Sequence, residues 1–132
     1  MENKKKKNML FRHLLNMPFI WILIIPMIIL DIFVELYHQV GFRLCSIPLV
    51  KRSNYIKMDR QRLKYLSLVD KMGCAYCGYA NGLAGYFLEI AARTEKYWCG
   101  IKHKKSKDFI EPEHHKDFVE YGDEAAYRKK YL

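Results

Sequence analysis

The longest apolar stretch of the chain occupies residues 17–30, where MPFIWILIIPMIIL contains no charged residue. Apolar positions continue beyond it, interrupted by Asp31 and Glu35, which are four residues apart and so lie on one face of a helix. The uncharged run alone is short for a helix that crosses about 30 Å of hydrocarbon, whereas residues 17–37 are long enough. Pro26 predicts a kink within this stretch. The pattern therefore predicts a membrane-embedded or membrane-spanning segment over residues 17–37.

Helical spacing also organises the second half of the chain. Asp59 is predicted to cap a helix over residues 59–71, with apolar residues on one side and basic residues on the other. A second helix is predicted from Leu83 to Gly100, after a glycine-containing turn at residues 78–82. We therefore expect a mainly α-helical chain, in which an N-terminal membrane segment precedes a small helical domain built around a Cys/His motif.

These patterns divide the chain into five regions. They are a basic, interfacial N-terminus (residues 1–16), the membrane segment (17–37), an interfacial connector (38–58), the helical Cys/His domain (59–107) and an acidic, partly solvated tail (108–132). A short helix is expected near residues 117–130 of the tail, and its two adjacent histidines, His114 and His115, are expected to be solvated.

The charge distribution supports membrane association. The chain has a net charge of +9, and its basic residues flank the apolar segment, where Lys and Arg are attracted to anionic headgroups. Arg43, Lys51 and Arg52 of the connector are the predicted headgroup contacts. No nucleic-acid recognition motif is present, so nucleic acid is not an expected partner. The expected partners are an anionic bilayer and either a second copy of the chain or another membrane protein.

Two membrane arrangements fit the sequence. One is a single tilted span, and the other is a monotopic, kinked segment that enters the bilayer and returns. Lys and Arg crowd both flanks, and this symmetry favours the monotopic arrangement, which keeps both flanks in the cytoplasm. No small-residue cleavage site follows the apolar segment, which argues against a removable signal peptide. A buried core helix of a soluble protein is the remaining alternative.

The most specific motif lies in residues 73–103, GCAYCGYANGLAGYFLEIAARTEKYWCGIKH. Cys74, Cys77, Cys99 and His103 form the pattern C-x2-C-x21-C-x3-H, a complete tetrahedral set for zinc or, as an alternative, for iron. A site with four protein ligands is closed, so it would stabilise the fold and leave no position for a substrate. The pattern therefore predicts a structural or interaction module.

Chain geometry limits the metal hypothesis. A straight helix over residues 80–98 would be about 28 Å long and would hold Cys77 and Cys99 apart. A site within one chain therefore requires a turn at residues 78–82, whereas a dimer could pair Cys74 and Cys77 of one chain with Cys99 and His103 of another. The alternative is a thiol/disulfide redox protein or enzyme that uses Cys74 and Cys77. Purely structural cysteines are a third possibility, and no catalytic signature favours an enzyme.

The segment DRQRLKYLSLVDKMGCAYCGYANGLAGYFLEIAARTEKYWCGIKH resembles a group of small bacterial membrane-associated proteins. The shared features are a proline-containing apolar segment, a VKR-type connector, a C-x-Y-C-x-Y-x-N-G motif and a later Y-W-C-P-I-K-H motif. The resemblance covers residues 17–103 and is densest over residues 59–103, with Gly100 in place of the group's proline. It implies a membrane-associated architecture and a special role for the Cys/His set, and it names no reaction. With the charge pattern, it leads us to expect a bacterial inner-membrane protein with a cytoplasmic C-terminal domain.

Overall fold

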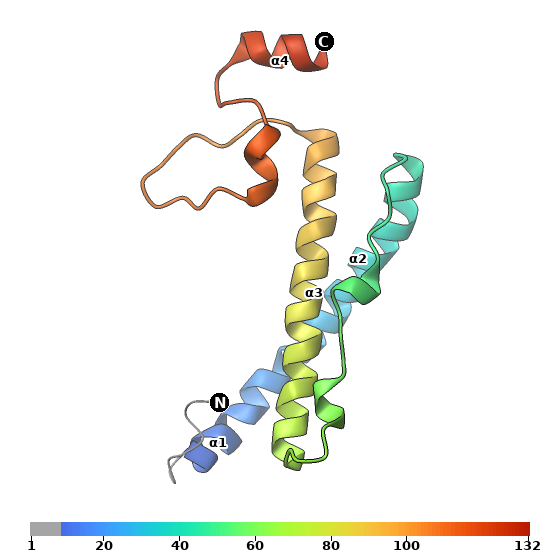
Figure 1. Cartoon of the computed structure of the whole chain (residues 1–132), viewed down its shortest axis with the longest axis vertical. Helices are drawn as coiled ribbons and strands as arrows, with labels where there is room; N and C mark the ends of the chain where they lie inside the picture. The colour runs from blue at the N-terminus through green and yellow to red at the C-terminus, as the bar shows by residue number, and fades with distance from the viewer. Residues whose placement is uncertain (1–8) are drawn as a thin grey trace. The chain divides into compact units, whose positions relative to one another are not determined.

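The computed structural model describes residues 9–132, which form four α-helices joined by turns and short 3₁₀ helices (Figure 1). The helices are α1 (Met9–Ile22), α2 (Ile24–Leu44), α3 (Leu68–Trp98) and α4 (Glu124–Tyr131), and the 3₁₀ helices are Arg52–Asn54, Arg60–Arg62 and Glu113–Asp117. In this part of the chain the only β-structure is an isolated bridge between Ile101 and Val119. The expected mainly α-helical fold is confirmed.

α1 and α2 are two parts of one apolar helical stretch that is interrupted at Leu23. Pro26 has no N–H group to donate to the Ile22 carbonyl, so a helical hydrogen bond is missing at this point. At the interruption the Leu23 N–H group donates to the Ile20 carbonyl, at 3.2 Å. The helix thus breaks three residues before Pro26, the residue from which the sequence predicted a kink.

α2 extends beyond the predicted end of the membrane segment, through Leu44 and into the predicted connector. Its buried residues are Val34, His38 and Phe42, which follow one another at intervals of four and so lie on one face. Phe42 is 0% exposed and His38 is 1% exposed. Packing of this face keeps the more polar residues of the stretch helical.

α3 is a single helix of 31 residues, where the sequence predicted two helices and a turn. The helix begins just after Ser67, whose hydroxyl accepts a hydrogen bond from the Asp70 N–H group at 3.2 Å and so caps the first turn. Asp59, the predicted cap, precedes only the 3₁₀ helix Arg60–Arg62 and makes no capping bond with its side chain. The predicted turn at residues 78–82 is wrong, because these residues continue the helix.

The glycines of the predicted turn allow another segment to approach α3 closely. A Cβ atom on Gly82 would lie 2.7 Å from the Ile56 Cα atom and from the Tyr55 carbonyl oxygen, and one on Gly78 would lie 2.9 Å from the Lys57 carbonyl oxygen. Real Cβ atoms do not come this close to backbone atoms. Gly78 and Gly82 therefore form a groove that seats residues 55–58, which explains two glycines inside a helix.

The chain divides into two compact units, Met1–Phe87 (unit 1) and Leu88–Leu132 (unit 2), and α3 contributes to both. The buried apolar residues of unit 1 are Val34, Phe42, Val50, Leu83 and Tyr86. Those of unit 2 are Ile90, Ala92, Phe118 and Val119. Each unit therefore has its own small core.

The C-terminal tail folds back within unit 2. The Val119 N–H group donates to the Gly100 carbonyl, and the Lys102 N–H group donates to the Val119 carbonyl, each at 2.8 Å. Asp123 caps α4 by accepting a hydrogen bond from the Ala126 N–H group at 2.9 Å. The short helix expected in the tail is confirmed as α4.

Candidate functional site

The stretch Phe11–Leu44 is long and apolar enough to cross a membrane. Only 6% of its most apolar window of 18 residues is buried, whereas the core helix of a soluble protein would be mostly buried. Phe19 is 72% exposed, Phe33 is 65% exposed and Leu44 is 80% exposed. A large apolar surface of this stretch is thus left uncovered by the rest of unit 1.

The covered and exposed residues of this stretch form two opposite stripes. Covered positions recur every three or four residues, at Met17, Ile20, Ile24, Met27, Asp31, Val34, His38 and Phe42. Exposed apolar positions lie on the opposite side, at Leu15, Phe19, Ile22, Ile25, Ile29, Ile32, Phe33, Leu36, Val40 and Leu44. One face of the helical stretch therefore packs against the rest of unit 1, and the opposite face is an apolar outer face.

A charged pair ties α2 to the segment that follows it. The Arg52 guanidinium donates two hydrogen bonds of 2.6 Å to the two carboxylate oxygens of Asp31, which also accepts a 2.7 Å bond from the Tyr79 hydroxyl. Burial, followed by the bond to Asp31, raises the pKa of Tyr79 to about 12. The predicted headgroup contacts of Arg43, Lys51 and Arg52 stay predictions. The Arg52 side chain, which is 40% exposed, is also bound to the Asp31 carboxylate.

His38 extends this polar network to α3. Its Nε2 atom accepts a 2.9 Å hydrogen bond from the Val50 N–H group, which places the proton on Nδ1, 2.9 Å from the Tyr86 hydroxyl. Tyr86 donates in turn to Glu35 Oε2 at 2.7 Å. Burial and then the bond to Glu35 raise the pKa of Tyr86. Both nitrogens of His38 thus have partners, and the network holds α2, α3 and the intervening segment together.

The structure does not bring the four predicted metal ligands together. Cys74 and Cys77 lie inside α3, Cys99 directly follows its last residue, and His103 lies in the loop beyond. Because α3 is continuous through residues 78–82, the turn that a single-chain site requires does not form. The dimeric arrangement and the zinc or iron at this motif stay predictions, as does the redox role of Cys74 and Cys77. These two thiols line one open pocket together with residues of α1.

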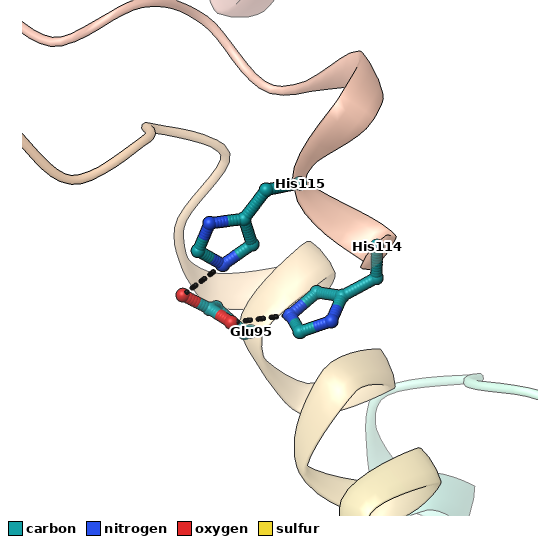
Figure 2. Close-up of side chains that lie close together, drawn as sticks. All are labelled: Glu95, His114 and His115. Atoms are coloured by element: carbon teal, nitrogen blue, oxygen red, sulfur yellow. Dashed lines mark hydrogen bonds and ion pairs between the residues drawn. The ribbon is translucent and has the colours of Figure 1, made fainter. Parts of the chain in front are cut away.

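A different cluster of ligand-type side chains lies in unit 2. Glu95 near the end of α3 faces His114 and His115, which belong to the 3₁₀ helix Glu113–Asp117 (Figure 2). The His114 Nε2 atom is 2.6 Å from one carboxylate oxygen, and the His115 Nε2 atom is 3.0 Å from the other. The side chains of His115, His114 and Glu95 are 1%, 17% and 32% exposed. One ligand atom from each lies within 4.8 Å of the others.

The expectation that His114 and His115 are solvated is wrong. The backbone hydrogen bonds between Val119 and the loop after α3 carry the tail back, so the histidine pair is brought against the helix. Burial by itself would raise the pKa of the Glu95 carboxyl, but hydrogen bonds with His114 and His115 lower it on balance. Glu95 therefore stays a carboxylate between two imidazole rings.

The sequence carried a weak signal for this cluster. His103, His114 and His115 stand close together, and Glu95 precedes Cys99 by one helical turn. In the structure the His103 ring lies 5.7 Å from the His115 ring, measured between centroids. The C-x-x-C spacing is a stronger metal-binding pattern in the sequence than a glutamate and two distant histidines.

Comparison with known proteins gives no assignment: no family model, no curated protein and no solved structure matches the chain. The resemblance to small bacterial membrane-associated proteins therefore stays an expectation from the motif. The function has to be inferred from the residues of this chain.

Proposed function

We propose that the chain is a membrane-surface interaction module, in which α1 and α2 lie in the plane of the bilayer. The outer apolar face enters the lipid, the opposite face carries the rest of unit 1, and unit 2 serves as the interaction module. The observation that carries this proposal is the pair of opposite stripes on Phe11–Leu44.

An in-plane orientation fits the dimensions of the stretch better than a span. The two helices of this 34-residue stretch add up to about 51 Å, far more than the hydrocarbon thickness of about 30 Å, so part of the stretch would lie outside the hydrocarbon of a span. In a spanning arrangement Asp31, with Arg52 bound to it, would enter the membrane or its immediate boundary. A charged side chain at the centre of a bilayer costs about 2.5–3.5 kcal/mol.

The segments that pack along α1 also favour the in-plane arrangement over a span. Trp21 in α1 contacts Tyr76 in α3, with ring centroids 5.8 Å apart. An open pocket next to this contact is lined by α1 and by residues 60–77, which include the charged side chains of Arg60 and Asp70. If α1 crossed the bilayer, these charges would lie beside it in hydrocarbon. With α1 in the interface, they face water or headgroups.

Charge supplies the second attraction to the membrane. The four lysines at residues 4–7 precede α1, and Arg43 and Lys51 lie near the other end of the helical stretch. Basic residues near an anionic surface contribute about 1 kcal/mol each. The proposed location is the cytoplasmic face of a bacterial inner membrane, and a second copy of the chain or a membrane protein is the proposed partner of unit 2.

The experiment is flotation of the full chain with vesicles of neutral or anionic phospholipid. Phe19→Gln/Phe33→Gln is expected to weaken binding at least tenfold, because each phenyl ring contributes about 1.5–3 kcal/mol when it is buried. The matched control is Ile110→Gln, which removes an apolar side chain that is 89% exposed in unit 2. Equal binding of all three proteins would contradict the proposal.

Protease treatment of spheroplasts separates the in-plane arrangement from a span. Epitope tags at both ends of the chain should respond alike, since both ends lie on the same side of the membrane. Cleavage of one tag together with protection of the other would indicate a span, in which case the in-plane proposal fails.

A further inference from the structure

We propose that Glu95, His114 and His115 form a zinc-binding site in unit 2. The site uses none of the cysteines of the C-x2-C-x21-C-x3-H motif. It is independent of the proposed membrane binding, because all three residues belong to one compact unit and the apolar outer face belongs to the other.

One donor atom from each of the three side chains lies within 4.8 Å of the others. Both histidines turn their Nε2 atoms toward the Glu95 carboxylate, each toward a different oxygen, at 2.6 and 3.0 Å (Figure 2). In a tetrahedral zinc site with bonds of about 2.0–2.1 Å, neighbouring ligand atoms lie about 3.3–3.5 Å apart. Each of these two nitrogen–oxygen pairs would have to separate by about 0.3–0.9 Å to admit the ion.

The types of the donors select the metal. Two imidazoles and one carboxylate form the ligand set of many zinc sites, whereas magnesium and calcium prefer sites made of oxygen alone. Three protein ligands leave the fourth tetrahedral position to water, so this site would be open, in contrast to the closed site predicted from the cysteines.

Among residues 9–132, no lysine or arginine forms an ion pair with the Glu95 carboxylate. Within residues 9–132 its ion-pair partners are His114 and His115, whereas Asp31 in unit 1 is bound by Arg52. His115 is 1% exposed, and its Nδ1 atom has no hydrogen-bond partner among these residues.

The histidine pair is held in place before any ion binds. The His115 N–H group donates to the Pro112 carbonyl at 3.0 Å, and the His115 carbonyl accepts from the Phe118 N–H group at 2.9 Å. The His115 ring stacks on the Phe118 ring with centroids 4.7 Å apart. Because backbone and ring are both fixed, little ordering is left for zinc to impose.

The test is a titration of the full chain, purified in detergent and stripped of metal with a chelator. Calorimetry with Zn²⁺ should give one ion per chain. Co²⁺, which reports on its ligands by absorption, should give visible bands without a thiolate-to-cobalt charge-transfer band. Glu95→Gln and His114→Ala should each weaken zinc binding at least tenfold, while Cys74→Ser/Cys77→Ser should bind as the unmodified chain does.

Three results would overturn the site: no zinc bound, a thiolate charge-transfer band that disappears in the cysteine variant, or unchanged binding by Glu95→Gln. The Glu95→Gln side chain keeps the shape of the original and still accepts a hydrogen bond, so its circular dichroism should be unchanged. If that variant loses helix, His114→Ala decides, because the His114 ring lies nearer the surface.

Discussion

The polar network of unit 1 and the polar cluster of unit 2 both combine carboxylates with histidines, but only the first includes an arginine. In unit 1 the Asp31 carboxylate is matched by the Arg52 guanidinium, and both nitrogens of His38 are hydrogen-bonded. In unit 2 the Glu95 carboxylate meets two histidines and no arginine or lysine of the described chain.

The difference separates groups that hold a fold from groups prepared for a ligand. A carboxylate that a guanidinium binds through two hydrogen bonds has little affinity left for a cation. A carboxylate between two imidazoles keeps its charge and has nitrogen donors beside it. Histidines lie beside carboxylates in both clusters. What distinguishes the two clusters is the presence or absence of an arginine bound to a carboxylate.

The largest effect is expected from Arg52→Ala. The Asp31 side chain is 14% exposed, so removal of its partner leaves a mostly buried carboxylate with only the Tyr79 hydroxyl. We expect a loss of about 3 kcal/mol in the free energy of unfolding, measured by urea denaturation in detergent.

A double-mutant cycle sharpens this prediction. Asp31→Asn/Arg52→Ala should cost less than the sum of the two single changes, because the second change removes the charge that the first leaves unpaired. Additive costs would mean that the pair contributes nothing as a pair, and the contrast between the two units would then fail.

The next effect is stabilisation by zinc, which depends on the proposed site. Zinc at 100 times its dissociation constant should stabilise the folded chain by about 2.7 kcal/mol, and a chelator should remove this gain. Arg52→Ala should keep the zinc-dependent gain, while Glu95→Gln should lose it. A gain of equal size in Glu95→Gln would place the ion elsewhere.

Substitution of Gly82 tests whether the polar network depends on the groove in α3. A Cβ atom at this position would collide with the backbone of residues 55–56, close in sequence to Arg52. Gly82→Ala should destabilise the fold by about 1–3 kcal/mol.

The control is Gly73→Ala in the same helix, where an added Cβ atom meets nothing within 4 Å. This change should stabilise the chain by about 0.5–1 kcal/mol, as an alanine does in a helix. If both variants change stability by the same amount, residues 55–58 do not lie in the groove.

The smallest effect concerns Tyr79 at high pH. Its pKa is raised from about 10 to about 12, so its neutral form is favoured in the folded chain. The resulting stability is fully present below pH 10 and is lost as pH rises toward about 12. Tyr79→Phe should flatten this part of the stability curve, measured by alkaline unfolding; an identical curve in the variant would show that Tyr79 is not coupled to Asp31.

Local pattern predicted much of this structure. The apolar run, the break before Pro26 and the short helix in the tail each depend on residues that are neighbours in sequence. The role of Gly78 and Gly82 could not be predicted from neighbouring residues, because the sequence does not distinguish a glycine in a turn from one in a helix that another segment approaches closely. Only the position of residues 55–58 decides between the two.

The candidate site was missed for a related reason. Whether His114 and His115 are solvated depends on the return of the tail to Gly100 through Val119, a contact between residues far apart in sequence. The bond between Arg52 and Asp31 likewise joins residues 21 positions apart in sequence. Long-range pairings of this kind leave no periodic signature.

α3 belongs to both units, and this has an evolutionary consequence. The boundary after Phe87 falls inside a continuous helix, so genetic recombination at this point would divide α3. The part left to unit 2, residues 88–98, is shorter than the roughly 12–15 residues that an isolated helix needs. Recombination at this boundary would therefore leave neither unit with a complete α3. The two units should be inherited together.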